Sequence, residues 1–514
     1  MRKRRSKPSN PSKPSNPEPP PRQPEKSRPW NTIVLVVLSI SVYANSLAND
    51  FVGDDKDQLL GNPVVTGHRI TQAISTGVWA FRHANTNYYR PLQILVYMLF
   101  HAVFGFHAVP FHLFSVLLHA VNSVLVYRLG SQITGRPRAA LASALLFAVH
   151  PIHTEVVDWI AAYPDLMVTS ILLFGMWRFT RQKGPLRPLA IAGYSGIYLA
   201  ALATKETGVM LPLLFLAYER ICLSRRLPEL KRKLPLYYAM LAVLGIYLVA
   251  RRWALGSLAP AEHLFFQLTP LEFASSVVVI AAQYAGKLIF PGGLNFFHVF
   301  HPTMGFSLEF WIALAVLAAV AAAAVWRRTP AAMTFGIVWT ALCLAPALNL
   351  TGVGQNVFAE RYLYLPSAGF AWMAGLAWAW SAERHAAAAW AAGIAILCAS
   401  SWQTLLRNAD WRDDLTMLRK TVAQSPDAGI VHNNLAGLYV HRDEFDLALE
   451  QEREAVRCEP RSEIFHKQFG MLLELRDPRG AAREFEIASR LDPSDAEARN
   501  LLQEALQLAR SQPR

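Results

Sequence analysis

Residues 30–55 read WNTIVLVVLSISVYANSLANDFVGDD, an apolar run that ends in an acidic loop. The run from Thr32 to Leu47 is close to the length of a membrane crossing and lacks a clear small-x-small cleavage site, which favours an uncleaved span. Residues 1–29 contain nine prolines and nine Lys or Arg residues. This composition predicts a disordered cytoplasmic tail, so the acidic loop should lie outside.

The composition of the whole chain agrees with a membrane protein. Of its 514 residues 53% are apolar and only 17% are charged, which argues against an ordinary cytosolic enzyme and against a disordered chain. Four cysteines in this length exclude a disulfide-stapled fold. The net charge of +13 is uneven, because residues 410–514 hold 15 basic and 20 acidic residues. The basic charge therefore indicates membrane topology and does not predict nucleic-acid binding.

Apolar stretches recur to about residue 405 and predict an all-α, polytopic membrane helix bundle over residues 30–409. Eleven spans place every basic loop in the cytoplasm and residues 410–514 outside, provided that residues 91–105 and 271–290 do not cross. The first of these has the length of an interfacial segment, whereas the second is long enough to cross. Besides the first span, the prediction covers residues 110–129, 139–150, 163–179, 188–204, 207–223, 234–253, 307–326, 331–348, 362–380 and 386–405.

The tail over residues 410–514 has an internal period. Pro426, Pro460 and Pro493 are 34 and 33 residues apart, and small or aromatic residues recur between them. This spacing predicts a tetratricopeptide repeat (TPR) array of antiparallel α-hairpins, in which small residues let two helices pack closely. A generic bundle of helical hairpins is the alternative.

Acidic residues of the membrane region fall mainly on the predicted outer face, which predicts one polar cavity opening outward, with ordinary loop charges as the alternative. The adjacent Asp54 and Asp55 are candidates for a general base, because mutual repulsion would raise one pKa. The pair is equally suited to hold a divalent cation such as Mg²⁺ or Mn²⁺ through oxygen ligands.

Three separate outer loops carry the cations Arg90, Lys205 and Arg361. Their side chains are suited to binding a phosphate, although a membrane anchor or a structural ion pair would account for each of them alone. His150 and His153 form a His-x-x-His pattern with no cysteine nearby, which is not a zinc signature. We therefore predict no metal site there, and expect a loop that binds the acceptor or handles protons.

These residues carry a resemblance to a known family. The run from Tyr43 to Asp55, together with Asn62-Pro63, resembles the start of the transmembrane and tetratricopeptide repeat O-mannosyltransferase-like family. The resemblance covers residues 32–510. Further matching motifs are Tyr89-Arg-Pro-Leu92, Phe111-His112, His150-Pro-Ile-His-Thr-Glu155, Lys205-Glu206-x-Gly208 and Glu360-Arg-Tyr-Leu-Tyr-Leu-Pro366.

The resemblance implies a fold of the GT-C superfamily of polytopic glycosyltransferases, which take a sugar from a polyprenyl-phosphate carrier at the outer membrane face. By that similarity Asp54 or Asp55 corresponds to the catalytic acid of the first loop, and Glu155 and Asp158 lie in a second catalytic loop. The positions expected to contact the carrier phosphate are Arg90, Lys205 and Arg361. This chain has about two and a half repeats, fewer than the eukaryotic members.

The expected function is therefore an inverting membrane glycosyltransferase that moves a sugar such as mannose from a polyprenyl-phosphate donor to a hydroxyl of a protein or glycan acceptor, with the repeats as a candidate acceptor-binding region. Another transferase or ligase for lipid-linked glycans, and a non-catalytic TPR membrane scaffold, are the alternatives. A composition rich in Ala, Arg and Trp indicates a bacterial inner membrane with the repeats in the periplasm. The divalent cation is the one cofactor left open.

Overall fold

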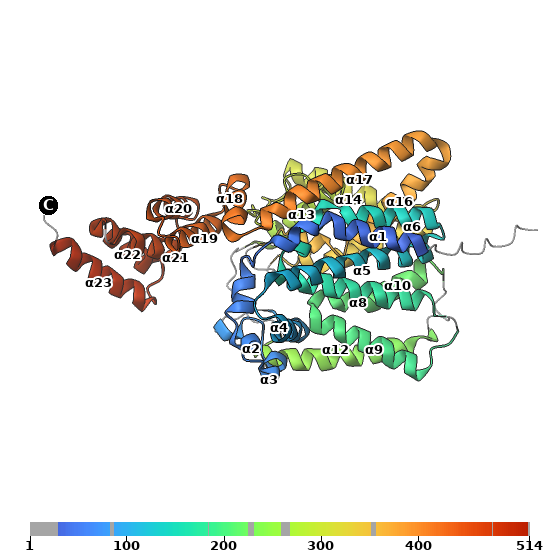
Figure 1. Ribbon diagram of the computed structural model, residues 1–514, viewed down its shortest axis with the longest axis horizontal. Coiled ribbons are helices and arrows are strands. Elements are labelled where there is room, and N and C mark those ends of the chain that lie inside the picture. Colours follow the sequence, from blue (N-terminus) through green and yellow to red (C-terminus); the bar gives the residue numbers. More distant parts are fainter. Residues whose placement is uncertain are drawn as a thin grey trace, which may run out of the picture.

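A computed structural model describes residues 29–82, 87–182, 184–224, 231–258, 268–350, 356–474 and 476–511. Over these ranges the chain folds into helices and turns and contains no β-strand (Figure 1). The predicted all-α class is confirmed. The basic tail over residues 1–28 lies outside the described residues, so its disorder stays a prediction.

Helices occupy every stretch that the apolar pattern marks as a span. Proline stands in the first turn of several helices of the bundle, where its missing N–H costs no hydrogen bond. The bundle contains α1 (Pro29–Val42), α5 (Ala108–Thr134), α6 (Pro137–Val149), α8 (Tyr163–Thr180), α9 (Pro188–Thr204), α10 (Leu211–Ile221), α12 (Leu234–Leu255), α13 (Pro270–Ile289), α14 (Leu308–Val325), α15 (Ala331–Leu344), α16 (Ser367–Arg384) and α17 (Ala386–Asn408). The other helices of this region stand between them in the chain: α2 (Pro63–Thr66), α3 (Ile70–Ser75), α4 (Pro91–Phe104) and α7 (Thr154–Asp158).

Six helical segments of the described chain are long and apolar enough to cross a membrane, and a seventh is obtained if the bent pair α6 and 151–158 counts as one span. Helices α1, α4 and α9 are apolar but shorter. Many apolar side chains on the outside of the bundle are exposed, among them Val249, Trp311 and Val325. This outward apolar surface is typical of a multi-pass membrane protein. The predicted number of eleven spans stays a prediction.

The bundle has two chemically different ends. The loop end carries residues 50–61, 150–162, 205–210 and 356–366, and lies on the left of the bundle in Figure 1. The basic end carries the turns near residues 135, 182, 223 and 385, where Arg136 pairs with Glu383 and Lys233 pairs with Glu219. The loops predicted to share the outer face therefore meet at one end of the molecule, and those predicted to be cytoplasmic meet at the other.

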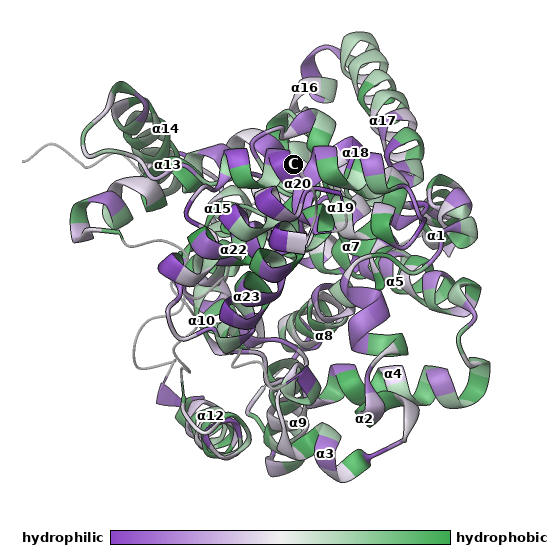
Figure 2. Ribbon diagram, turned by 90° about the vertical axis from the view of Figure 1, so that its left-hand side faces the viewer, coloured by the Kyte–Doolittle hydropathy of each residue, from purple (hydrophilic) through white to green (hydrophobic). Residues whose placement is uncertain are grey.

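Helix α4 differs in direction from the long helices. Figure 1 shows it nearly end-on, whereas Figure 2 shows it lengthwise while α8, α9 and α12 are seen end-on. It therefore lies across the bundle axis at the loop end, as a segment at a membrane interface would. This direction agrees with the interpretation of residues 91–105 as a segment that does not cross.

The C-terminal region extends from the loop end as a row of helices (Figure 1). Equivalent contacts recur with the predicted period. His432 bonds Gln451 and the carbonyl of Pro426, and His466, 34 positions later, bonds Glu484 and the carbonyl of Pro460. The His432–Gln451 contact joins α19 to α20 and the His466–Glu484 contact joins α21 to α22, so each pair of helices forms a hairpin. The assignment to the TPR family stays a prediction. The row contains α18 (Asp414–Gln424), α19 (Gly429–Val440), α20 (Phe445–Cys458), α21 (Glu463–Leu473), α22 (Pro478–Leu491) and α23 (Ala496–Ser511).

A small hydrophobic core joins the first of these hairpins to the loops of the bundle. Trp159 stacks on Trp411 with ring centroids 6.1 Å apart, and both lie in one buried cluster with Val52, Met417 and Leu435. The C-terminal region is thereby packed directly against the acidic loop that follows α1.

Candidate active site

The acidic loop after α1 separates its two adjacent carboxylates into different environments. Asp55 is buried, and its two oxygens accept hydrogen bonds from the backbone N–H groups of Val52 at 3.1 Å and Ala161 at 2.6 Å. Asp54 is only partly buried, and its one recorded hydrogen bond is a long contact of 3.4 Å from Gln58. Asp55 therefore fixes the loop against the segment 160–162, while Asp54 keeps hydrogen-bonding capacity for another molecule.

The pKa values of the two carboxyls are raised mainly by burial. Burial raises the pKa of Asp54 to about 6, against the lowering effect of the nearby Arg361. The pKa of Asp55 is also raised well above its usual value by burial, and repulsion from Asp54 is a smaller cause. The sequence predicted that repulsion within the pair would raise one pKa. The pKa values are raised, but burial away from water is a larger cause of the rise than repulsion between the two carboxyls. A carboxylate with a pKa near 6 is a better proton acceptor than an ordinary aspartate and remains ionised at neutral pH.

Arg361 is held by Glu155, a carboxylate from the loop between α6 and α8. The guanidinium donates to Glu155 Oε1 at 2.6 Å, and the backbone N–H of Arg361 donates to Oε2 at 2.8 Å. Glu155 is fully buried, whereas the Arg361 side chain is 16% exposed. Both oxygens of Glu155 thus accept hydrogen bonds from Arg361 and hold it in place, and the predicted catalytic role of Glu155 stays a prediction.

Lys205 lies beside Arg361 and is paired with an acid from α8. Its ammonium donates to both carboxylate oxygens of Asp165 at 2.6 Å. The ring of Tyr362 lies 5.4 Å from the Lys205 ammonium and 4.9 Å from the Arg361 guanidinium. Burial lowers the pKa of Lys205, and Asp165 partly offsets this effect. The Tyr362 ring therefore links the two cations in one group.

Arg90 extends the same group towards α12. Its Nε and Nη2 donate to Glu206 Oε2 at 3.2 and 2.8 Å, and its guanidinium lies 4.4 Å from the centre of the Tyr88 ring. Arg251 approaches the other oxygen of Glu206 at 3.7 Å and donates to the carbonyl of Asn87. The three cations predicted from separate loops therefore converge, and each has an acidic partner.

Asp158 and the two histidines are more deeply buried than Asp54. Asp158 is fully buried and lies near Ser46 and Arg407. His150 bonds the carbonyl of Leu288, and His153 bonds the hydroxyl of Ser367. Their predicted roles, a second catalytic acid and an acceptor-binding loop, stay predictions; the contacts present join the loop to neighbouring helices.

Several residues of the site were not singled out by the sequence. Asp165, Tyr362 and Trp159 surround the cations, and the Trp159 ring lies 5.3 Å from the Arg361 guanidinium. Asp165 is one of the acids that the sequence predicts on the outer face, and this shared face makes it a candidate partner of Lys205. The positions of Tyr362 and Trp159 depend on contacts between loops more than 200 residues apart, which no local pattern reveals.

A divalent cation has little support in the geometry. Among the described residues no group of three or more His, Cys, Asp or Glu side chains is arranged to hold a metal ion. Both oxygens of Asp55 accept backbone hydrogen bonds, whereas Asp54 has only the long contact with Gln58. The divalent cation suggested by the adjacent pair stays a prediction, and the proposed reaction includes no step that needs it.

Comparison with known proteins agrees with these features. Residues 90–253 match the family described as "Dolichyl-phosphate-mannose-protein mannosyltransferase". The chain is 26% identical over 477 residues to the protein O-mannosyl-transferase TMTC4 of Mus musculus. This alignment covers 79% of this chain and 63% of that protein. It is also 25% identical to TMTC3 of Mus musculus, over 90% of this chain and 55% of that protein.

A third relative is the protein O-mannosyl-transferase F38B6.6 of Caenorhabditis elegans, 24% identical over 79% of this chain and 59% of that protein. The chain thus spans about three fifths of the length of the curated relatives it matches. The resemblance predicted from the ordered motifs is confirmed by these similarities.

Proposed function

We propose that this chain transfers a mannosyl residue from a polyprenyl-phosphate carrier to an acceptor hydroxyl at the loop end of its helix bundle. The observation that carries the proposal is the position of Asp54, a partly exposed carboxylate with a raised pKa, beside the cation group of Arg361, Lys205 and Arg90. A base and a set of phosphate-binding cations are the two parts that transfer from a lipid phosphate requires. The similarity to protein O-mannosyl-transferases supports mannose as the sugar and a protein as the acceptor.

The proposed reaction is a single displacement. Asp54 takes the proton of the acceptor hydroxyl as the oxygen attacks the anomeric carbon. The new carbon–oxygen bond forms while the bond from that carbon to the phosphate oxygen breaks, and its electron pair leaves with the phosphate. Attack from the side opposite the phosphate inverts the anomeric carbon. The products are the mannosylated acceptor and the free carrier phosphate.

The cations stabilise the negative charge that grows on the leaving phosphate. Arg361 is suited to this because its hydrogen bonds to Glu155 fix its orientation, so its side chain needs little reorganisation during the reaction. The hydrogen bonds of Arg90 to Glu206 use Nε and Nη2, which leaves Nη1 for a ligand. Pairing with acids keeps the cations in place before the donor arrives.

A direct assay tests this proposal. Purified protein in liposomes is supplied with synthetic polyprenyl-phosphate mannose and a Ser/Thr peptide, and transfer is measured by mass spectrometry of the peptide. We expect mannosylated peptide from the unmodified chain and transfer slowed by about 10²–10⁴-fold in the Asp54→Asn variant. Binding of the donor with no transfer to any peptide or glycan acceptor would contradict the proposal and favour a scaffold.

The scaffold alternative is tested by shortening the chain, and the structure decides where to cut. Asp414 in α18 accepts from the N–H of Gly53 and pairs with Lys56 at 2.6 Å, so removal of α18 would disturb the Asp54 loop. The informative variant therefore removes residues 461–514 and keeps α18–α20. We expect it to bind donor like the full chain, whereas a scaffold would lose partner recruitment.

The face of the membrane is tested separately. The proposal places the loop end and the C-terminal hairpins outside, where the lipid carrier presents its sugar. A reporter that is active only in the periplasm, fused after Arg514, should be active. Activity of a cytosol-only reporter at this position would contradict the predicted topology and would make α13 a crossing helix.

A further inference from the structure

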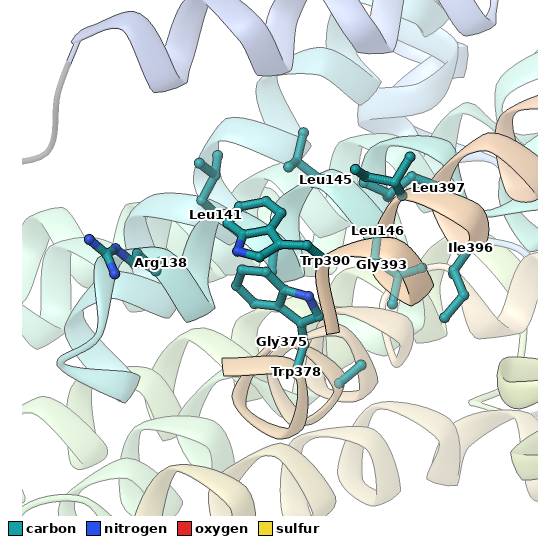
Figure 3. A pocket seen from close by; sticks show the side chains of 13 residues that line it. Arg138, Leu141, Leu145, Leu146, Gly375, Trp378, Trp390, Gly393, Ile396 and Leu397 are labelled. Atoms are coloured by element: carbon teal, nitrogen blue, oxygen red, sulfur yellow. The ribbon is translucent and has the colours of Figure 1, made fainter. Parts of the chain in front are cut away.

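An apolar groove opens on the side of the bundle towards the basic end, far from the cation group. It lies between α6, α16 and α17 and has a volume of about 240 Å³ (Figure 3). Aliphatic and tryptophan side chains line it, and Arg138 is the one charged residue among them. A cavity of this composition accepts a hydrocarbon body with one anionic group at its edge.

Two tryptophans form the wall of the groove. Trp378 and Trp390 pack edge to face, with ring centroids 4.8 Å apart at an angle of 84°. The indole N–H of Trp378 donates to the carbonyl of Ala389 at 2.9 Å, which fixes this ring across the turn between α16 and α17. Gly393 leaves room for it, since a Cβ there would lie 2.9 Å from Trp378 Nε1. The groove is therefore a built feature of the α16–α17 hairpin.

The groove has a polar mouth and an apolar far end. Figure 3 shows Arg138 at one end of it and Ile396 and Leu397 at the other. Arg138 is exposed and forms no ion pair with any described residue, whereas Arg136, two positions earlier, pairs with Glu383. From Arg138 to Leu146 helix α6 rises by about 12 Å at 1.5 Å per residue, enough for a large part of an acyl chain.

We propose that this groove binds one acyl chain of a membrane phospholipid whose anionic headgroup pairs with Arg138. An opening on the apolar outer surface of a membrane bundle is filled from the lipid phase, so the occupant is a hydrocarbon chain. The unpaired guanidinium at the mouth selects a negative headgroup by charge complementarity. The exposed indole of Trp390 lies where tryptophan is favoured at membrane interfaces. This inference requires membrane embedding but does not depend on the proposed transferase activity.

The prenyl tail of a donor fits this groove less well. His150, beside the candidate site, ends α6 twelve residues after Arg138, which is about 18 Å along the helix. A donor with its phosphate at Arg361 would therefore leave Arg138 without an anion. A phospholipid of the other leaflet matches both the groove and the charge.

The test measures which lipid the purified full-length chain retains. The protein is delipidated, titrated with phosphatidylglycerol or phosphatidylcholine in mixed micelles, and examined by native mass spectrometry. We expect one phosphatidylglycerol to be retained in preference to phosphatidylcholine. Arg138→Ala should weaken retention about fivefold, because a basic side chain near an anionic membrane surface contributes about 1 kcal/mol. Ala142→Phe, which places a ring in the groove, should abolish retention.

Two variants serve as matched controls. Arg187→Ala removes an exposed arginine at the basic end that does not line the groove, and Ala319→Phe adds a ring to an exposed position of α14. Both should retain phosphatidylglycerol like the unmodified chain. Equal retention of the two phospholipids, unchanged retention in both Arg138→Ala and Ala142→Phe, or displacement of the phospholipid by a polyprenyl phosphate at equal concentration would each overturn the proposal.

Discussion

The two ends of the bundle use the same kinds of ion pair in different ways. At the basic end Arg136 and Glu383 form a surface pair with side chains 43% and 62% exposed. At the loop end Arg361 and Glu155 pair with side chains 16% and 0% exposed. An exposed pair contributes little to stability, because water competes for both charges, whereas a buried acid beneath an arginine fixes its direction. The comparison shows that two Arg–Glu pairs of the same chemistry differ in burial, and that only the buried glutamate fixes the direction of its arginine.

The loop end also has a carboxylate of a kind that the described residues of the basic end lack. Asp54 forms no ion pair with any described residue and remains partly exposed. Glu219 and Glu383 at the basic end are both paired with cations. A base must be accessible and must have a free oxygen, and Asp54 meets both conditions.

The largest expected effect follows from removal of this base. Asp54→Asn keeps the size of the side chain and removes its basicity, so turnover in the liposome assay should fall by about 10²–10⁴-fold. Donor affinity should change little. The matched control is Glu383→Gln at the basic end, which should keep full turnover. Full activity in Asp54→Asn would end the assignment of this residue as the base.

A smaller effect is expected from the cation that Glu155 orients. Arg361→Ala should weaken donor binding by roughly 10- to 150-fold, the equivalent of 1.5–3 kcal/mol for a hydrogen bond to a charged group. The measurement is a titration with the lipid-linked sugar. Arg136→Ala, its counterpart at the basic end, should leave donor affinity unchanged.

Loss of Arg361 also leaves Glu155 buried without a partner, which destabilises the fold. The double variant Arg361→Met with Glu155→Gln removes both charges and separates binding from folding. If it melts like the unmodified chain and still binds donor with full affinity, the phosphate site lies elsewhere.

The adjacent aspartates are expected to differ in stability. Asp55→Asn turns one of two acceptor oxygens into an N–H₂ group that faces a backbone N–H, which should cost about 1–3 kcal/mol. Thermal unfolding in detergent checks this. Asp54→Asn, one position away, should unfold at the temperature of the unmodified chain or above it, because it removes a carboxylate whose ionisation is disfavoured by burial. Equal melting temperatures for the two variants would mean that Asp55 does not hold the loop.

The smallest effect concerns pH. Burial raises the pKa of Asp54 to about 6, while Arg361 opposes that rise; Asp57 and Gln58 are the other groups that face it. As a base Asp54 must be ionised, so turnover should increase as pH rises through about 6 and level off above 7. In the double variant without Arg361 the midpoint should move to higher pH, because the charge that favours the carboxylate is gone. Removal of Arg136 should leave the midpoint where it is.

The sequence predicted the helical class and the residues that gather at the loop end. Apolar length marks a helix in a membrane protein, and the alternation of basic loops separates the two ends. Arg90, Lys205 and Arg361 could be grouped on one face by this means alone. The acidic partners could not be assigned, since Asp165 lies in the first turn of α8 whereas Glu206 follows α9, and their pairing depends on helix packing.

By itself, then, the sequence determined which loops share an end, because hydrophobicity and charge act locally along the chain. The tertiary structure alone decided the roles within Asp54-Asp55, where two identical side chains differ only in what surrounds them. Asp55 points to the backbone N–H of Ala161, 106 positions away, and Asp54 lies in reach of Arg361. Burial and hydrogen bonding arise from such distant contacts, and they set the pKa and the accessibility on which a catalytic role depends.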